Sequence, residues 1–247
     1  MAGEFIYGRN AARESLRARR RHIHKLWLAD HLQASPVIDE ILSLARQLKI
    51  TIQSVSRKEL DKLATGHQGV VLETGRYPTV TIDAILQRAD KLGEPPFIIV
   101  LDHIEDPHNL GAMLRTAEAV GLHGVVIPKQ RAAAITPAVV HVSAGAAEHI
   151  WVAEVANLTQ VLKKLKEQNI WIVGLEKAAG ALAFHAANLT GPIALVVGSE
   201  GQGLSRLIRE NCDFLVQLPM RGRIESLNAS VACGLILYEI WRARGFA

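Results

Sequence analysis

Runs of apolar residues alternate with stretches of helical periodicity through the last two thirds of the chain. Each run is short, rich in Val, Ile and Leu, and bounded by turn residues, which is typical of a buried strand. The predicted strands are residues 97–102 (FIIVLD), 124–127, 149–155, 170–176, 193–197 and 214–218. Because helical segments separate these strands, this part of the chain predicts an α/β fold with a largely parallel sheet.

The first third repeats the alternation on a smaller scale. Ser56 followed by Glu59 is a capping box, so a short helix is expected to begin there. The other predicted elements are strands at residues 24–29, 50–55 and 66–74 and helices after Gly8 and over Val37–Lys49. This pattern predicts a small α/β domain of its own.

Turn residues mark the boundary between the two parts. They lie at both ends of residues 75–96, which hold one amphipathic helix over Ile82–Leu92. We predict a small α/β domain over residues 1–75, a linker over residues 76–95 that acts as a hinge, and a larger domain over residues 96–247.

Two loops at strand ends are the first candidates for a ligand site. The sequence GSEGQG (198–203) follows one strand, and MRGRIES leads from another strand into a long helix that begins near Ser226, with Asn228 in its first turn. Ligands of open α/β sheets bind outside the carboxyl ends of the strands, and glycine lets a ligand approach the main chain. The spacing G-x-x-G-x-G is neither the dinucleotide fingerprint nor a Walker A loop. A tight connection without a ligand is the competing interpretation.

The helix after strand 97–102 carries a further pair of charged residues. Asp106 is its predicted N-cap, Pro107 its first residue, and Gly121 its end. Arg115 and Glu118 lie three residues apart, away from the packing positions, so the pattern alone favours a helical ion pair.

Composition narrows the class of protein. The 247 residues are 49% hydrophobic and 21% charged, the balance of an ordinary globular protein. Cys212 and Cys233 are too few for a disulfide framework or a four-ligand zinc site. The first residues lack the apolar core of a signal peptide, and the longest apolar run, Val231–Leu237, is too short to span a membrane. We expect a soluble, cytoplasmic protein without a metal or a membrane partner.

The positive charge is concentrated in the first third of the chain. Residues 1–76 hold 13 Lys and Arg against 8 Asp and Glu, a net charge of +5, whereas the other 15 Lys and Arg face 16 Asp and Glu, a net charge of −1. Cations favour a nucleic-acid partner because they displace its counterions, although a solvated surface is the alternative. The candidate RNA contacts lie on the first helix and just after it: Arg9, Arg13, Arg17 and Arg20.

Three segments in their order along the chain resemble a known family. They are residues 97–121 (FIIVLDHIEDPHNLGAMLRTAEAVG), 194–205 (ALVVGSEGQGLS) and 218–239 (LPMRGRIESLNASVACGLILYE). They are similar to the three motifs of the SpoU (TrmH) family of RNA ribose 2′-O-methyltransferases, which use S-adenosylmethionine. The first 75 or so residues resemble the small domain, similar to ribosomal protein L30, that precedes the catalytic domain in the RlmB branch of that family.

The resemblance implies a fold and a set of site residues. It implies a SPOUT-type, mostly parallel sheet with a C-terminal trefoil knot, preceded by an L30e-like α/β domain. It places Arg115 and Asn109 in the active site, with Glu200, Ser226 and Asn228 shaping the loops around donor and ribose. It gives the donor contacts to Gly198, Gly201, Leu218 and Leu227. It also implies a guanosine of 23S ribosomal RNA in the peptidyl-transferase region as the substrate, and a homodimer that pairs through the last helix.

Several alternatives stay open at this point. Arg115 can act as proton acceptor or, because a guanidinium normally stays protonated, as a grip on a phosphate and on the developing alkoxide. The substrate can be a tRNA or another ribosomal site. A silent RNA-binding protein and an enzyme that uses GSEGQG as a phosphate loop are two further classes. One departure from the family is the bulky Ile224 and the charged Glu225 before Ser226, where relatives have small residues.

Overall fold

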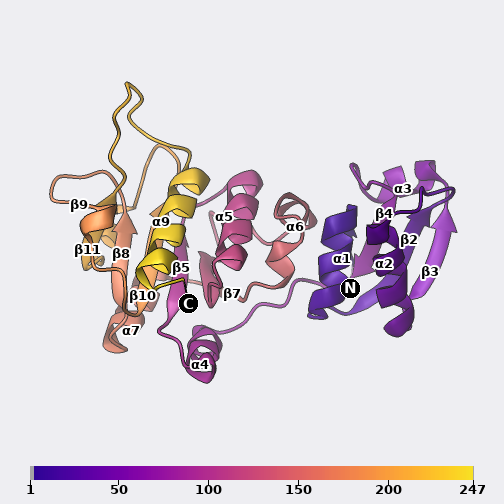
Figure 1. Cartoon of the computed structure of the whole chain (residues 1–247), viewed down its shortest axis with the longest axis horizontal. Helices are drawn as coiled ribbons and strands as arrows, with labels where there is room; N and C mark the ends of the chain where they lie inside the picture. The colour runs from indigo at the N-terminus through magenta and orange to yellow at the C-terminus, as the bar shows by residue number, and fades with distance from the viewer. Residues whose placement is uncertain (1–2, 247) are drawn as a thin grey trace. The chain divides into compact units, whose positions relative to one another are not determined.

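The computed structural model describes residues 3–246, and the chain forms two compact units (Figure 1). One unit holds Met1–Pro78 together with Ile135–His149, and the other holds Thr79–Ala134 and Ile150–Ala247. The segment 135–149 therefore comes from the middle of the larger unit's sequence but folds with the N-terminal unit. The chain passes between the units at residues 78/79, 134/135 and 149/150, where the sequence suggested one hinge.

The first unit is built on a four-stranded sheet with the order β1-β4-β2-β3. Strand β4 pairs antiparallel with both β1 and β2, and β3 pairs parallel with β2. The strands are β1 Glu4–Tyr7, β2 Ile23–Ala29, β3 Thr51–Val55 and β4 Val70–Thr74. This arrangement confirms the small α/β domain that the sequence predicted.

The helices of this unit include the segment that returns from later in the chain. They are α1 Arg9–Ala18, α2 Pro36–Gln47, α3 Arg57–Leu63, α6 Pro137–Val142 and the 3-10 helix η1 Ala146–Glu148. The predicted capping box of Ser56 and Glu59 starts α3. Helix α6 packs against β1, where the ring of His141 stacks on Tyr7 with the centroids 4.7 Å apart.

A buried ion pair fixes the segment 135–149 in the first unit. The side chains of Arg21 and Glu148 are fully buried, with Nη2 of Arg21 2.9 Å from Oε1 of Glu148. Nε of Arg21 also donates to Oε2 of Glu148 at 3.1 Å, and Arg21 forms a second ion pair with Glu4. A buried charge is tolerated when it is paired and hydrogen-bonded. Arg21 is therefore a structural residue, and the expectation that it belongs to an exposed basic face is wrong.

The second unit is built on a seven-stranded sheet with the order β7-β6-β5-β10-β8-β11-β9. All its strand pairs are parallel, which confirms the prediction from the sequence. The strands are β5 Phe97–Asp102, β6 Gly124–Pro128, β7 Val152–Val155, β8 Trp171–Leu175, β9 Leu182–Ala183, β10 Ile193–Gly198 and β11 Phe214–Gln217. The two strands that are buried throughout, β5 and β10, are neighbours inside the sheet.

Alternate residues of the inner strands face different helices. Ile98 and Val100 of β5 join Ala194 and Val196 of β10 in one apolar cluster with residues of α4, α7 and α8. Helices α5 and α9 pack against each other and lie side by side in Figure 1. The helices are α4 Ile82–Leu92, α5 Pro107–Ala119, α7 Leu158–Glu167, α8 Arg206–Glu210, α9 Ala229–Ala243 and the 3-10 helix η2 Phe184–Ala186. No helix within residues 3–246 has the length and apolar character needed to cross a membrane.

Helix caps decide where the site loops end. Asp106 caps α5 as predicted, because its Oδ1 accepts a hydrogen bond from the His108 N–H at 2.8 Å. Asn228 is the N-cap of α9 and not a residue of its first turn, since its Oδ1 accepts from the Ser230 N–H at 2.9 Å. The loop before α9 is therefore longer than the sequence suggested, and it ends on a side chain with polar atoms left for other contacts.

Candidate active site

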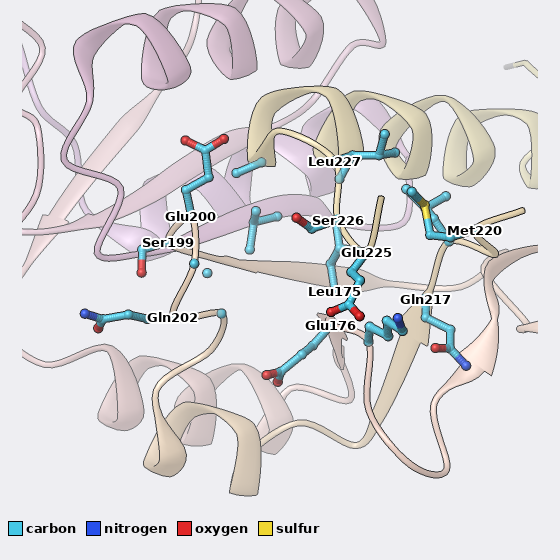
Figure 2. Close-up of a pocket in the computed structure, with 18 residues that line it drawn as sticks. Leu175, Glu176, Ser199, Glu200, Gln202, Gln217, Met220, Glu225, Ser226 and Leu227 are labelled. Carbon is cyan, nitrogen blue, oxygen red and sulfur yellow. The ribbon is translucent and has the colours of Figure 1, made fainter. Parts of the chain in front are cut away.

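A pocket of about 460 Å³ opens among the loops that follow the carboxyl ends of β8, β10 and β11 (Figure 2). Both loops that the sequence singled out line it, and the loop after β8 is a third wall that the sequence did not indicate. Its lining includes the predicted residues Gly198, Glu200, Gly201, Leu218, Ser226 and Leu227. Parallel strands bring their carboxyl ends to one edge of the sheet, which places the three loops together.

The glycine loop, residues 198–203, folds back on itself so closely that Gly198 has no room for a side chain. A Cβ at Gly198 would lie 2.2 Å from the backbone C and O of Gly203. The Gly203 N–H donates to the Ser199 carbonyl at 3.0 Å and closes the turn. Gly201 and Gly203 have φ values of +83° and +67°, which favour glycine. These glycines are needed for the loop's own conformation as well as for an approach to the main chain.

A hydrogen-bonded polar cluster joins the three sequence motifs at the mouth of the pocket. Nδ2 of Asn109 on α5 donates to Oε2 of Glu200 at 3.2 Å. Nδ2 of Asn228 donates to Oδ1 of Asn109 at 2.9 Å and to Oε1 of Glu200 at 3.0 Å. Each of these residues comes from a different motif, so the cluster fixes the three motifs relative to one another. The structure thus brings three of the predicted catalytic residues into direct contact.

Asp102 is a buried anchor that sequence reasoning missed. It ends β5, and its Oδ2 accepts a hydrogen bond from the backbone N–H of Ser205 at 2.8 Å, while Oδ1 lies 2.5 Å from Nδ1 of His103. These contacts attach the glycine loop to the start of the α5 motif. The signal was a carboxylate at the end of an otherwise apolar strand, which a buried position tolerates only with partners.

The loop after β8 adds an acidic side to the pocket. Glu176 lies against the glycine loop and is paired with Arg209 of α8, with 2.5 Å between Oε1 and Nη2. A Cβ at Gly203 would meet Oε1 of Glu176 at 2.8 Å. Glu225 lines the same pocket from the loop before α9, and Lys177 adds one cation. The carboxyl end of β8 was the available signal, because it reaches the same edge of the sheet.

Arg115 lies apart from this pocket within the chain. It is exposed on α5 and is not among the residues that line the pocket. Within residues 3–246 it forms no ion pair with Glu118 or any other acidic residue, so the helical ion pair expected from the pattern is absent. Its guanidinium is available for a partner outside the chain.

The predicted RNA-binding arginines are mostly engaged within the first unit. Arg13 pairs with Glu14, and Arg17 pairs with Glu14 and Glu40. Arg20 donates to the Pro78 carbonyl at 3.2 Å and to the Tyr77 hydroxyl at 3.3 Å. Arg9 instead lines a cavity with Arg57, His67 and Gln68, where its Nε donates to the Gln68 carbonyl at 3.2 Å.

The other reactive groups of the chain do not form a second chemistry. Burial raises the pKa values of Cys212 and Cys233 to about 12, so both thiols stay protonated and are poor nucleophiles. Within residues 3–246 there is no group of three or more His, Cys, Asp and Glu residues suited to a metal ion.

A parallel sheet with a glycine loop, a cap asparagine and a pocket at its carboxyl edge defines a nucleotide-binding α/β protein. Comparison with known proteins gives the family. The profile of the SpoU rRNA methylase family matches residues 96–238, and the profile of the RNA 2′-O ribose methyltransferase substrate-binding domain matches residues 5–80. The chain belongs to the SpoU family and is an RNA 2′-O-methyltransferase of that family.

Individual relatives match over nearly the whole chain. YacO of Bacillus subtilis, whose name leaves tRNA and rRNA open as substrates, is 46% identical over 98% of this chain and 96% of its own. The 23S rRNA (guanosine-2′-O-)-methyltransferase RlmB of Pseudomonas putida is 40% identical over 98% and 97%. The structure of the SpoU methyltransferase AviRb from Streptomyces viridochromogenes, in complex with AdoMet, aligns with a TM-score of 0.83 at 25% identity, over 98% of this chain and 91% of that chain.

Proposed function

We propose that this protein transfers a methyl group from S-adenosylmethionine to the 2′-hydroxyl of a guanosine in 23S ribosomal RNA, in the peptidyl-transferase region. The observation that carries the proposal is the cluster of Asn109, Glu200 and Asn228, which joins the three motifs beside a nucleotide-sized pocket. The near-complete match to a 23S rRNA guanosine methyltransferase supports the choice of RNA. The proposed setting is the cytoplasm, where ribosomal RNA is modified.

The pocket fits the chemistry of the methyl donor. S-adenosylmethionine carries a positive sulfonium and an amino group, and the pocket presents the carboxylates of Glu176 and Glu225. It also carries an apolar adenine ring, which suits the side chains of Leu175, Leu218 and Leu227. When bound, the donor supplies an activated methyl group, so Gly198 and Gly201 serve to position it by their backbone.

We assign the chain's polar residues to alignment and charge stabilisation. Methyl transfer breaks the bond from sulfur to the methyl carbon, forms the bond from that carbon to the ribose oxygen, and releases the hydroxyl proton. Asn109, Glu200 and Asn228 hold the loops so that donor and hydroxyl meet, an effect worth several kcal/mol. Ser226 lines the pocket beside them. The guanidinium of Arg115, which stays protonated, lowers the free energy of the developing alkoxide.

A homodimer supplies Arg115 to the site of the other subunit. Helix α9 exposes Val231, Leu235 and Tyr238 by 51, 49 and 46%, although large apolar side chains usually lie inside. These residues lie four and three apart and so form one stripe. Arg115 is exposed on α5, the helix that packs on α9, so pairing of two copies through these helices carries each Arg115 toward the partner.

The knot and the domain roles belong to the same proposal. Strand β10 lies between β5 and β8 although β6 and β7 intervene in sequence, and the chain then continues to β11 beyond β8. Such a crossing supports the trefoil knot implied by the family. The domain over residues 1–75 binds RNA, with Arg9 as the best-placed of its predicted contacts, because Arg13, Arg17 and Arg20 are held within the unit.

Mapping ribose methylation tests the substrate. Purified protein, S-adenosylmethionine and unmodified 23S ribosomal RNA should give one new 2′-O-methylguanosine, and a strain without the gene should lack that methyl group. Total tRNA is the parallel substrate. Methylation of tRNA with unchanged ribosomal RNA would replace the substrate assignment, and failure to bind S-adenosylmethionine would remove the enzyme's donor.

A further inference from the structure

Two more cavities continue from the donor pocket along the carboxyl edge of the sheet. The middle cavity, of about 450 Å³, shares Ser199, Glu200 and Gln202 with the donor pocket and also reaches Asn109. A third cavity of about 430 Å³, called here the basic cavity, shares His103, Arg131 and Ser205 with the middle cavity. The three cavities therefore form a continuous series in the second unit, and the polar cluster lies between the first two.

The sign of charge changes along this series. The donor pocket is lined by Glu176, Glu200 and Glu225 against one lysine, and the middle cavity by Glu105, Asp106 and Glu200 against His103 and Arg131. The basic cavity is lined by Lys129, Arg131 and His103, with Asp102 as its acidic residue. Asp102 is buried and hydrogen-bonded to His103 and Ser205, so its charge is already compensated.

The two cations of the basic cavity stand on an anchored loop. The N–H of Lys129 donates to the Val155 carbonyl at 2.9 Å, and the N–H of Ala133 donates to the Ile104 carbonyl at 2.8 Å. Arg131, between these anchors, is exposed and has a φ of +55°. Neither Lys129 nor Arg131 forms an ion pair with another residue in the described range 3–246. Fixed backbone and unpaired charge are what a binding site for an anion requires.

We propose that the basic cavity binds a backbone phosphate of the RNA next to the methylated nucleotide, through Lys129 and Arg131. This inference rests on the proposed function, because it takes the ribose to lie in the middle cavity beside Asn109 and Glu200. A phosphate is excluded from the acidic middle cavity by like charge and is attracted to the basic one. The apolar side chains of Leu158, Leu207 and Ile208 also line the basic cavity, which suits a phosphate that belongs to a nucleotide.

The test is a charge-neutralising double variant with a matched control. Lys129→Gln/Arg131→Gln removes both cations, whereas Lys91→Gln/Lys163→Gln removes two exposed lysines of α4 and α7 that have no ion pair within residues 3–246 and do not line these cavities. Binding of unmodified 23S ribosomal RNA is measured against salt concentration without donor. Affinity for S-adenosylmethionine is measured by calorimetry and also reports that the variant is folded.

The expected results separate this inference from the proposed function. The Lys129/Arg131 variant should bind RNA at least about 10-fold more weakly, with a salt slope reduced by about 1.4 to 1.8, while the donor affinity stays unchanged. Its loss of kcat/KM should come mainly from KM, and Arg131→Lys should recover part of it. Equal RNA affinity and salt slope in the two double variants would overturn the inference. Absence of methyl transfer by the unaltered protein would instead contradict the proposed function, because the binding measurement needs no catalysis.

Discussion

The glycine loop and the arginine-rich segment of the first unit both carry strong signals in the sequence, but the fold uses them in opposite ways. The polar residue of the loop, Glu200, reaches out to two other motifs and leaves a pocket open. The arginines on and after α1 turn inward: Arg21 is buried against Glu148, and Arg17 is paired with Glu40. Glycine spacing therefore indicated a site, whereas the count of arginines overstated the charge available to RNA.

The difference follows from how each signal depends on distant residues. A glycine loop at the end of a strand is a local property, and the strand order only decides what lies beside it. The net charge of +5 over residues 1–76 does not include Glu148, which comes from the returning segment 135–149 and neutralises Arg21. Deleting residues 1–76 would leave that segment without its sheet, so point variants are the better test of RNA binding.

The largest effect that we expect is loss of stability when the buried pair is broken. Arg21→Ala leaves the Glu148 carboxylate buried without its partner, which costs roughly 3 to 5 kcal/mol. Urea unfolding of the first unit's transition measures this, because a chain with two units need not unfold in one step. Arg19→Ala is the control, since Arg19 is exposed and has no ion pair in the described part of the chain. Equal effects of the two substitutions would show that Arg21 is not structural.

Next in size is the effect of Arg115→Ala on catalysis. Removing a group that stabilises transition-state charge lowers kcat by about 10²- to 10³-fold. Stability and affinity for S-adenosylmethionine should stay the same, because Arg115 is exposed and does not line the donor pocket. Single-turnover kinetics and calorimetry measure the two quantities. The neighbouring exposed Glu118→Ala is the control, and a large loss of donor affinity in Arg115→Ala would contradict the assigned role.

Mixing variants tests whether Arg115 acts across the dimer. Chains with Arg115→Ala and chains with Gly198→Trp are each inactive, but a hybrid dimer holds one site with an intact donor loop and an intact arginine. Mixing should therefore restore part of the activity. If subunit exchange is demonstrated and no activity returns, each site is built from a single chain.

A smaller effect, on donor binding, is expected from Gly198→Ala. The added Cβ lies 2.2 Å from the backbone of Gly203, so the glycine loop must shift. We expect this to cost about 1 to 3 kcal/mol, or roughly 10- to 100-fold in affinity for S-adenosylmethionine. Gly191→Ala is the matched control, because a Cβ there has nothing within 4 Å. An unchanged donor affinity in Gly198→Ala would mean that the loop is only a connection.

Local signals predicted most of the elements, and long-range contacts account for what was missed. The helix expected over residues 82–92 is α4 Ile82–Leu92, and Asp106 and Pro107 start α5, because caps and helical spacing act within one turn. The motif residues Asn109, Glu200 and Asn228 were chosen from the resemblance, and their mutual contacts became visible only in the fold. Asp102 and Glu176 were missed because their partners, Ser205 and Arg209, are far away in sequence.

The smallest effect distinguishes arginines that bind RNA from arginines that hold the fold. Arg17→Gln/Glu40→Gln removes an ion pair without changing the net charge, so RNA affinity should stay within about twofold if Arg17 is only structural. Arg9→Gln removes a cation that has no acidic partner in the described residues and lines an open cavity with Arg57. It should lower the salt slope by about 0.7 to 0.9, as loss of one phosphate contact does. Lys49→Gln, another exposed cation of the same unit, corrects for net charge. A larger loss of affinity in the Arg17/Glu40 variant than in Arg9→Gln would reverse the assignment and return α1 to the RNA-binding surface that its sequence suggested.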